Sequence, residues 1–484
     1  MRCLRDSPSG YADVRTTGSP QEARAVRACR RNRAPCPASK CRMNQERVSL
    51  RSDLFVQFFG ALDTANIDYV IVGQTAGFPA RISSDVDFVV RPVDLARVVG
   101  IIWKGSGTAH VHQVLQHEIG ALYFVLTVRA QNNFVHFHPD VSTDYRRRGR
   151  LWLTADFLLS ARVREPAGFW KPAIPAAFAY YLVKRIDKLS LDASHLRYLQ
   201  SLFEDAPREC EEIGRRLLGG AAFETFLSYL PKHAAVPDAV LAELQKALNA
   251  HANREPAVRA LVARWLELRR VLRRIYRPTG LVIAVLGPDG AGKSTVIEGM
   301  RLELGQMFRR TDYFHLRPRI VRRGGTGTVA TTDPHRLPPR GTIASLTKLA
   351  MYVMDSLLGY ALRVFPLKRR SSLVIFDRYP HDVLADPNRY RLSTPRWLNA
   401  LLLSAIPRPD LWLVLEAPAS VLLGRKAEVS PAACEAQLAG YRRLLQQLPN
   451  AVGIDTSKSP QASIADACEA VLARMRERLV KPVV

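Results

Sequence analysis

The sequence predicts an α/β protein with two folded parts. One is a C-terminal parallel sheet with helices on both faces, and the other is an N-terminal α+β domain with a helical extension. Short apolar runs alternate with helical patterns after residue 280, which is typical of a parallel sheet. Residues 54–140 mix helix and strand patterns, and residues 151–278 have apolar residues at helical spacing.

Composition and charge narrow the classes of protein that fit. The 484 residues suffice for about two to four domains, and 47% hydrophobic with 24% charged residues excludes a disordered chain. A formal charge of +26 favours polyanionic partners such as nucleotides. The seven cysteines form no disulfide or zinc pattern, which predicts a reducing, cytoplasmic location. No apolar run reaches about 18 residues, so no membrane-spanning helix is expected.

Shifts in composition divide the chain into four segments. Residues 1–42, rich in Arg, Pro, Ser and Cys, are expected to be a disordered basic tail. Residues 43–250 form the first domain with its helical extension, residues 251–279 a connector helix, and residues 280–484 the second domain.

The connector helix is both apolar and basic. From Val258 to Tyr276, apolar residues recur every three or four positions between arginines. Such a helix suits either nucleic-acid binding or a solvated linker. We expect the linker, and no stable nucleic-acid partner.

A pair of aspartates marks the first domain. After a strand pattern come a turn at Gly73-Gln74 and a second strand that contains Asp85 and Asp87. Carboxylates at i and i+2 on a strand share one face, where they can hold Mg²⁺ against the phosphates of a nucleotide. We therefore predict Asp85 and Asp87 as metal ligands.

This glycine turn followed by D-x-D resembles the signature of the nucleotidyltransferase fold. The resemblance is partial, because the family opens its turn with Gly-Gly or Gly-Ser and has a third carboxylate on a later strand. On the matching strand, Phe134–Asp140, His138 stands at the expected carboxylate position and Asp140 lies two residues on. The resemblance implies either a working transfer site or a degenerate one that binds a nucleotide without transferring it.

Histidines and arginines gather in the same domain. H-x-H on a strand puts both rings on one face, which suits either a transition metal or a solvated polar face, and we expect the solvated face. The arginines that follow either grip phosphate or are solvated. These residues are His110, His112, His117, His136 and His138, then Arg146, Arg147, Arg148 and Arg150.

The strongest motif opens the second domain. The apolar run Leu281–Leu286 leads into Gly-Pro-Asp-Gly-Ala-Gly-Lys-Ser-Thr, which satisfies G-x-x-x-x-G-K-[ST]. Glycines let backbone N–H groups surround a phosphate, and the next helix points its positive end at it. Lys293 reaches the β- and γ-phosphates, and Ser294 is placed for Mg²⁺. The predicted ATP-binding residues are Gly287, Asp289, Gly290, Gly292, Lys293, Ser294 and Thr295.

The order of motifs after this loop resembles the thymidylate kinase family of P-loop kinases, from Gly280 to the end of the chain. The strands expected after the loop lie at residues 312–318, 372–376, 409–415 and 452–455, with helices between them. The matching motifs are GPDGAGKST, the strand-ending DRY, PDLWLVLEAP, and RKAE before a helix with Gln437 and Tyr441.

The resemblance implies roles on the acceptor side of the site. Asp377 would help to hold Mg²⁺ and order the acceptor, and Arg378 would contact the acceptor phosphate. Arg317, in an Arg-Pro turn, is similar to the family's acceptor-phosphate arginine.

The resemblance also implies catalytic cations. Some members carry an arginine inside the phosphate loop, where this chain has Ala291. The catalytic arginine would then come from the family's lid segment, and Arg425, with Lys426 beside it, is the candidate. Together with Lys293 it would neutralise charge on the transferring phosphoryl group.

One departure concerns the acceptor base. The family reads thymine with an arginine and, two residues later, a glutamine; the corresponding positions here hold Ser356 and Leu358. Neither side chain makes a bidentate hydrogen-bond pair, although Asp355 is near and Tyr352 could stack on a ring. The sequence thus supports the kinase chemistry better than specificity for thymidine.

The leading hypothesis is ATP- and Mg²⁺-dependent phosphoryl transfer to a nucleoside monophosphate or a related small acceptor. Two alternatives stay open: a nucleotidyltransferase regulated by an ATP-binding domain, and a non-catalytic interaction protein switched by ATP. The resemblance also makes a homodimer an expectation.

Overall fold

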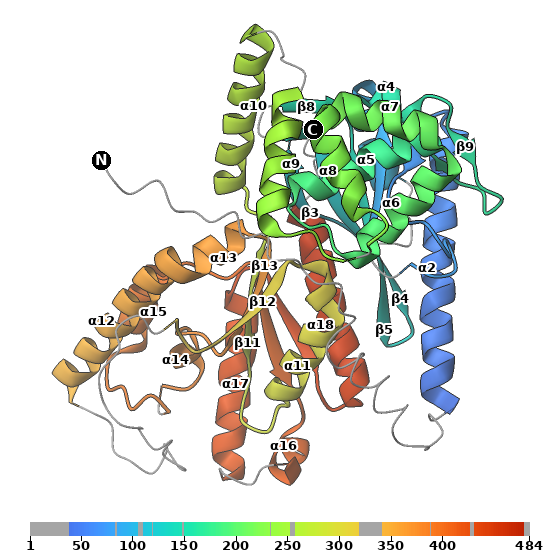
Figure 1. Cartoon of the computed structure of the whole chain (residues 1–484). Coiled ribbons are helices and arrows are strands. Elements are labelled where there is room, and N and C mark those ends of the chain that lie inside the picture. Colours follow the sequence, from blue (N-terminus) through green and yellow to red (C-terminus); the bar gives the residue numbers. More distant parts are fainter. Residues whose placement is uncertain are drawn as a thin grey trace.

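The computed structural model describes residues 38–82, 85–104, 110–118, 120–147, 150–232, 234–251, 257–318, 341–387, 389–425 and 430–478. The N-terminal part, from blue to green, lies against the C-terminal part, from yellow to red (Figure 1). The predicted tail lies mostly outside the described residues, but helix α2, Ala38–Thr64, already covers residues 38–42.

The C-terminal part is built on a five-stranded parallel sheet, as predicted. Its strand order is β12-β13-β11-β14-β15, so the strand before the phosphate loop lies in the centre. Parallel strands need crossover connections, and these supply helices to both faces. The strands are β11 (Leu281–Leu286), β12 (Arg310–His315), β13 (Ser372–Asp377), β14 (Leu411–Glu416) and β15 (Ala451–Asp455).

Two helical layers cover this sheet because β11 is apolar on both sides. Leu281, Ile283 and Val285 pack in one core with α11 and α18, while the alternate residues pack in another with α12 and α15. The helices are α11 (Lys293–Leu304), α12 (Thr342–Gly359), α13 (Phe365–Arg369), α14 (Asp382–Ala385), α15 (Arg396–Ser404), α16 (Ala419–Arg425), α17 (Pro431–Gln447) and α18 (Pro460–Arg478). A π-helical turn, Tyr360–Val364, joins α12 to α13.

The N-terminal part contains a mixed sheet of six strands. The order is β1-β2-β6-β4-β3, with β5 also paired to β4, and the β2–β6 pair is parallel. Two strands, β5 and β6, stand where the sequence predicted one. The bounds are β1 (Tyr69–Ile71), β2 (Val86–Val90), β3 (His110–Glu118), β4 (Ala121–Ala130), β5 (Asn133–Phe137) and β6 (Pro139–Ser142).

One face of the mixed sheet is covered by α2 and by α3 (Leu95–Lys104). Phe88 and Phe137 of the sheet pack there with Phe55 of α2 and Val98 of α3. The rings of Phe55 and Phe137 meet edge to face with centroids 6.1 Å apart. Burial of these aromatic rings ties the long N-terminal helix to the sheet.

The opposite face is covered over β1 and β2 by the predicted helical extension. Val70 and Val89 pack in one core with Phe178 of α5. The bounds are α4 (Ala155–Leu159), α5 (Ile174–Asp187), α6 (Ala193–Asp205), α7 (Pro207–Leu218), α8 (Gly220–Tyr229) and α9 (Asp238–His251). Two small hairpins pair β7 (Tyr145–Arg147) with β8 (Arg150–Leu153) and β9 (Val163–Arg164) with β10 (Trp170–Lys171).

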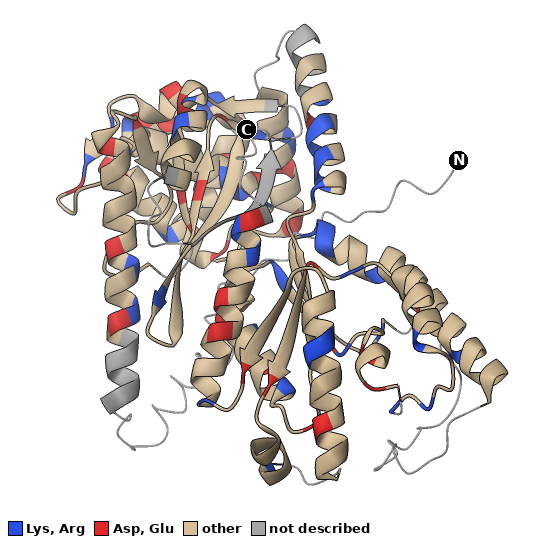
Figure 2. Ribbon diagram, turned by 180° about the vertical axis from the view of Figure 1, so that it is seen from behind, with Lys and Arg blue, Asp and Glu red and all other residues tan. Residues whose placement is uncertain are grey.

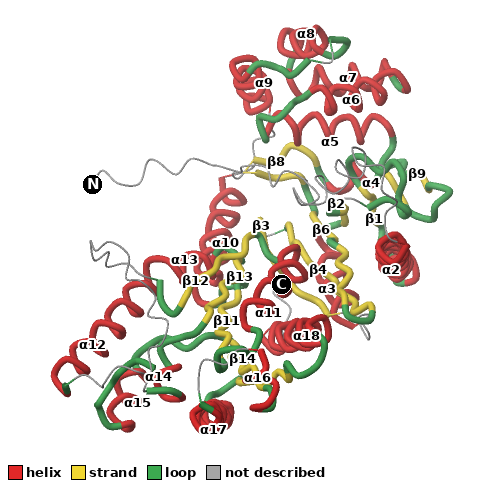
Figure 3. The backbone as a smooth tube through the Cα atoms, turned by 90° about the horizontal axis from the view of Figure 1, so that it is seen from below, coloured by secondary structure: helices red, strands yellow, loops and turns green. Residues whose placement is uncertain are grey.

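Over β4 and β5, the same face is covered by the C-terminal part itself. Val125 and Phe134 belong to one core with Met300 and Leu304 of α11 and Val471 of α18. Figure 3 shows α11 and α18 between the two sheets. These two helices therefore contribute side chains to a hydrophobic core that the two parts share.

Polar contacts reinforce this junction at Glu303. Its Oε1 lies 3.2 Å from Nη2 of Arg47, and its Oε2 accepts a hydrogen bond from the backbone N–H of Phe134 at 3.1 Å. Its carbonyl oxygen lies 2.8 Å from Nε2 of His136.

A helix of 20 residues, α10 (Ala257–Tyr276), stands where the connector helix was predicted. It leads directly into β11 and the phosphate loop (Figure 1). In the described part of the chain, no helix is long and apolar enough to cross a membrane.

Candidate functional site

The phosphate loop follows β11 at the centre of the parallel sheet. Gly287 has φ 148°, and a Cβ there would come 2.9 Å from the carbonyl oxygen of Leu415. Gly292 has φ 77° and forms the N-cap of α11. Glycine is needed at both positions, because side chains are strained at these angles and no space exists beside Gly287. The loop therefore presents its backbone and the positive end of α11 to the same space.

Lys293 lies folded back over the loop. It is 9% exposed, and its Nζ donates to the carbonyl oxygens of Gly287 at 3.0 Å and Pro288 at 2.7 Å. Burial, and then the Arg378 guanidinium, lower the pKa of Lys293 to about 8, although Asp289 opposes them. A phosphate would add counter-charge to a lysine whose nearest carboxylate, Asp289, is 3.8 Å from its Nζ. Ser294 and Thr295 follow on the exposed first turn of α11.

Asp289 of the loop is held between two arginines. One carboxylate oxygen lies 2.6 Å from Nη2 of Arg378, and the other lies 2.5 Å from Nη1 of Arg389. Burial alone would raise the pKa of Asp289, but Arg378, Arg389 and Lys293 lower it to about 2. Three cations thus converge beside the loop, with this carboxylate between them.

Arg378 is fixed by more than this contact. Its φ is 67°, and its backbone N–H donates to the carbonyl oxygen of Val285 at 3.0 Å, beside the phosphate loop. A non-glycine residue in this conformation is uncommon and often belongs to a functional site. Its Nη1 donates to the fully buried Asp382 at 2.9 Å. Asp382 also accepts hydrogen bonds from Tyr390 at 2.8 Å and Tyr441 at 2.7 Å.

Our sequence reasoning missed Arg389 and Asp382. Asp382 lies four residues after Arg378, but Arg378 lies outside α14, so no helical spacing pointed to their contact. Arg389 lies in an irregular stretch, where no sequence pattern indicates that it faces Asp289. Gln437 belongs to the matching motifs, and its side-chain amide donates a hydrogen bond to the carboxylate of Asp386 at 2.9 Å.

Asp377 ends β13 opposite Val285 of β11, which brings it to the side of the loop. Its Oδ2 accepts a hydrogen bond from Tyr313 at 3.0 Å. Its Oδ1 is buried and has no hydrogen-bond partner among the described residues. A buried carboxylate oxygen without a partner is suited to a cation or an ordered water, so Asp377 fits the predicted role of a Mg²⁺-site residue.

Two of the predicted acceptor residues, Arg317 and Tyr352, come together beside β12. The Arg317 guanidinium lies 4.7 Å from the ring centroid of Tyr352, and its Nε is 3.3 Å from Oδ2 of Asp355. A Cβ on Gly359 would come 2.7 Å from Pro318, so glycine lets α12 approach the Arg-Pro turn. This arrangement presents one cation over one aromatic ring.

The two positions where the family reads its base differ in exposure. Ser356 is 4% exposed, and its hydroxyl is buried without a hydrogen-bond partner in the described part of the chain. Leu358 is 43% exposed. Neither observation restores a bidentate reader of thymine.

Arg425 lies apart from these groups. It is exposed at the end of α16, and its Nη2 donates to the carbonyl oxygen of Thr456 at 2.8 Å. Among the described contacts, none joins Arg425 to the phosphate loop, and Lys426 lies outside the described residues. The lid role of Arg425 stays a prediction.

A second candidate site lies on the mixed sheet. Asp85, Asp87 and Asp140 each offer an oxygen, and these atoms lie within 4.8 Å of one another. Asp140 stands opposite Asp87 in the parallel β2–β6 pair. The expectation that His138 occupies the third carboxylate position is therefore wrong. The chain bends at His138 into β6, which brings Asp140 level with the other two.

Lys184 of α5 pairs with one member of this carboxylate cluster. Its Nζ lies 2.7 Å from Oδ2 of Asp87, and this contact lowers the pKa of Asp87 against the effect of burial. Burial, and then the neighbouring aspartates, raise the pKa of Asp140 well above its ordinary value. Asp85 is exposed, yet desolvation by the surrounding protein, and then the charge of Asp87, raise its pKa as well. Three oxygen ligands with excess negative charge fit Mg²⁺.

The histidines do not form a solvated face where they are described. His136 is buried, with its Nδ1 2.9 Å from the Thr127 hydroxyl, and burial lowers its pKa to about 4. His138 lies 2.9 Å from the Tyr123 hydroxyl, and burial lowers its pKa to about 3. The His136 ring faces the C-terminal part at Glu303, whereas His138, just after β5, is half-buried.

Most of the other histidines and arginines that the sequence singled out in this domain lie outside the described side chains. The side chains of His110, His112, His117, Arg147, Arg148 and Arg150 are not among the described residues. Arg146 lies 3.4 Å from Asp144, so its described contact is with a carboxylate.

Comparison with known proteins gives distant similarity over part of the chain. No family model matches the chain. The thymidylate kinase of Xanthomonas campestris pv. campestris (strain B100) is 26% identical over 215 residues, 42% of this chain and 87% of that protein. The thymidylate kinase of Xylella fastidiosa (strain M12) is 26% identical over 157 residues, 31% of this chain and 64% of that protein. Part of this chain is therefore similar to thymidylate kinases, and its parallel α/β sheet is consistent with a P-loop kinase fold.

Proposed function

We propose that this protein is an ATP- and Mg²⁺-dependent kinase that transfers a phosphoryl group to a nucleoside monophosphate or a related small phosphorylated acceptor. The observation that carries the proposal is the convergence of Lys293, Arg378 and Arg389 around Asp289 at the phosphate loop. Phosphoryl transfer depends chiefly on positioned cations, and this cluster supplies three from separate segments.

The donor side uses the loop and the first turn of α11. Lys293 would leave its two carbonyl contacts and bind the β- and γ-phosphates of ATP. The Ser294 hydroxyl and Asp377 would hold Mg²⁺, which when bound would neutralise charge on the phosphates. The buried and unpartnered Oδ1 of Asp377 supports this assignment.

The acceptor side uses Arg378 and Arg317. Arg378 is oriented by Asp382 and Asp289, so its guanidinium is already in place before an acceptor phosphate binds. Arg317 lies over Tyr352, which supports a planar acceptor group near a phosphate. Because Ser356 and Leu358 replace the thymine readers, we propose no preference for thymidylate.

A panel of nucleoside monophosphates and other phosphorylated small molecules tests the proposal. The full-length protein is incubated with ATP and Mg²⁺, and ADP formation is measured with and without each acceptor. We expect at least one acceptor to raise ADP formation well above slow hydrolysis. Equal ATP turnover with and without every acceptor would contradict the proposal.

The carboxylate cluster favours a second candidate function, metal-dependent nucleotidyl transfer. Three carboxylate oxygens within 4.8 Å support it, since such a cluster can hold Mg²⁺ against a triphosphate. The reaction would release pyrophosphate from a nucleoside triphosphate. Pyrophosphate release that disappears in Asp140→Asn supports this function, and release that survives the substitution argues against it.

A further inference from the structure

Helix α10 carries an apolar stripe that points away from the protein. Along the helix, positions four, three, four and four residues apart lie on one side. They hold large side chains that are all exposed: Leu261 63%, Trp265 60%, Leu268 57%, Leu272 45% and Tyr276 82%. A surface helix normally buries such a stripe against the core. Here it forms a continuous exposed apolar surface.

The inner side of α10 is polar instead. Arg274 donates through Nε to the carbonyl oxygen of Arg369 at 2.8 Å, which ties the helix to the C-terminal part. Arg270 lies 2.8 Å from Glu267, and its side chain is only 15% exposed. The helix is therefore attached by polar groups with its apolar stripe turned outward, which is the reverse of ordinary packing.

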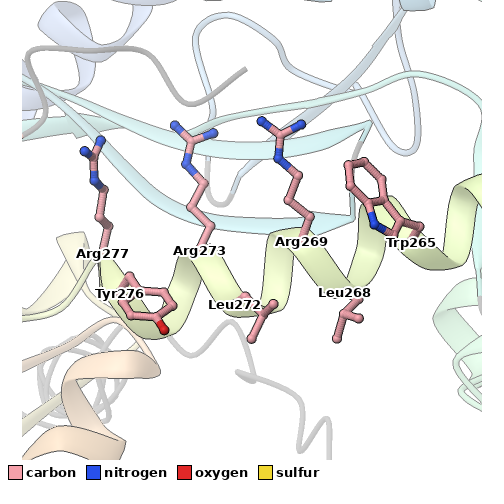
Figure 4. A pocket seen from close by; sticks show the side chains of 7 residues that line it. All are labelled: Trp265, Leu268, Arg269, Leu272, Arg273, Tyr276 and Arg277. Carbon is pink, nitrogen blue, oxygen red and sulfur yellow. The ribbon is translucent and has the colours of Figure 1, made fainter.

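A row of arginines runs beside the apolar stripe. Arg269, Arg273 and Arg277 are spaced four residues apart, and Figure 4 shows their side chains side by side, with Leu268, Leu272 and Tyr276 on the neighbouring stripe. Trp265, these leucines, Tyr276 and the three arginines line one open concavity of about 620 Å³. Among the described carboxylates, none pairs with these three arginines.

Charge decides what this surface can bind. Residues 257–277 contain seven arginines and a single glutamate, and Figure 2 shows Lys and Arg along α10 at the edge of the molecule. Burial, followed by Arg277 and Arg269, lowers the pKa of Arg273, as expected where like charges crowd together. A second copy of α10 would bring arginines against arginines. The partner must therefore be anionic as well as apolar.

We propose that α10 binds the surface of an anionic phospholipid bilayer, with the helix lying parallel to the membrane plane. At about 1.5 Å per residue, the stripe from Leu261 to Tyr276 presents about 23 Å of contact. Trp265 and Tyr276 would sit at the headgroup level, and Leu268 and Leu272 would enter the acyl boundary. Arg269, Arg273 and Arg277 would meet the lipid phosphates.

The shape of the surface favours a lipid over a folded partner. Six of the seven residues of the concavity belong to α10 and the seventh, Arg277, directly follows it, so the concavity lacks the second wall that a groove for a protein helix needs. A fluid bilayer needs no such wall. A nucleic acid would explain the arginines but would leave the aliphatic stripe without a role.

Vesicle co-sedimentation of the full-length protein tests the proposal. We expect binding to vesicles of equimolar phosphatidylcholine and phosphatidylglycerol, and little binding to phosphatidylcholine alone. Binding should weaken as NaCl rises from about 0.05 M to about 0.5 M, because salt screens the arginines. Absence of binding to the anionic vesicles, or equal binding to both kinds, would overturn the proposal.

Two variants and their matched controls assign the binding to α10. Replacing Arg269, Arg273 and Arg277 together with Gln should weaken binding by more than about 50-fold, at about fivefold for each arginine. The control replaces the exposed Arg197, Arg208 and Arg442 with Gln, which removes the same charge elsewhere. Trp265→Ser with Leu272→Ser should also lose binding. Its control is Trp397→Ser with Leu401→Ser, which changes residues that are 68% and 61% exposed on α15.

The controls also distinguish other partners. If a control weakens vesicle binding as much as its α10 counterpart, the assignment to α10 is wrong. If the protein binds RNA rather than vesicles, and the apolar variant binds that RNA equally well, α10 is a nucleic-acid helix and the proposal fails. Unchanged ATP turnover in the α10 variants shows that they fold, so a loss of vesicle binding reports on the surface itself.

Discussion

The phosphate loop and the carboxylate cluster each contain a buried lysine, but the two lysines are in opposite surroundings. Lys293 lies among Arg378 and Arg389, with Asp289 shared between the three cations, and its pKa falls to about 8. Lys184 lies among three aspartates, pairs with Asp87, and has a raised pKa. Lys293 thus shares its nearest carboxylate with two arginines, whereas Lys184 has three carboxylates beside it.

This difference indicates what each site needs from a ligand. A phosphate would add counter-charge beside Lys293, whose nearest carboxylate, Asp289, also pairs with Arg378 and Arg389. The carboxylate cluster is completed by a cation, since two of its three members have raised pKa values. The two sites are therefore complementary in charge, and a nucleotide with its metal could satisfy either.

The largest expected effect comes from removing the lysine of the loop. Lys293→Ala should lower kcat/KM of the proposed kinase by about 10³-fold, because a positioned cation at the transferring phosphoryl group is lost. Acceptor-dependent ADP formation measures it. Lys184→Ala is the matched control, with no loss of kinase turnover per folded molecule. Equal losses in the two variants would show that the sites are not functionally separate.

The second effect concerns stability and has different outcomes for two neighbouring aspartates. Asp87→Asn leaves the buried Lys184 without its partner and should cost about 2–3 kcal/mol of unfolding free energy. Asp140→Asn removes a carboxyl group whose pKa is raised by burial and then by Asp87 and Asp85, so its ionised form is disfavoured and the cost should stay within about 1 kcal/mol. Chemical denaturation at neutral pH compares them. A larger cost for Asp140→Asn would contradict this assignment of charges.

The third effect is an opposite dependence on pH. A bound triphosphate favours charged Lys293, so ATP affinity should be full below about pH 8 and fall as the pH rises above that value, by up to about tenfold per unit. Metal binding at the carboxylate cluster requires ionised Asp85 and Asp140, so it should strengthen as the pH rises through their raised pKa values. Titration calorimetry at several pH values measures both. Parallel trends would refute the charge comparison.

The smallest effect concerns the junction between the two parts. Glu303→Gln keeps the side-chain shape but weakens the contacts with Arg47 and the N–H of Phe134, and should cost about 1 kcal/mol. The control is Glu298→Gln, whose carboxylate pairs with Arg301 on the exposed side of the same helix. Thermal unfolding followed by two probes, one in each part, reports whether both parts lose stability together. A change confined to one part would show that the shared core does not couple them.

The sequence predicted the C-terminal fold well because its signals are local. The apolar run of β11, the glycines of the loop and the alternation of strands and helices are all contained in short segments. One of the helices expected between the strands corresponds to α12 and the π-helical turn that follows it. Arg317 and Tyr352, both predicted to contact the acceptor, lie together, although their role stays a prediction.

The sequence was less informative where long-range pairing decides the chemistry. Whether His138 or Asp140 stands beside Asp87 depends on the register of β2 with β6, which lie about 50 residues apart in the chain. His136 is buried because α11 packs on β5, a contact that no local pattern indicates. The inward face of α10 could not be inferred either, because an amphipathic pattern ordinarily predicts that the apolar stripe is the buried one.

The most direct test of the proposed kinase follows the γ-phosphate of ATP labelled with ³²P, with Mg²⁺ and the panel of monophosphates. The account predicts that the label appears on an acceptor, and that Lys293→Ala abolishes this transfer. Label found only in inorganic phosphate would indicate an ATP-switched protein. Pyrophosphate release without acceptor labelling would move the chemistry to Asp85, Asp87 and Asp140, and either result would contradict the proposed function.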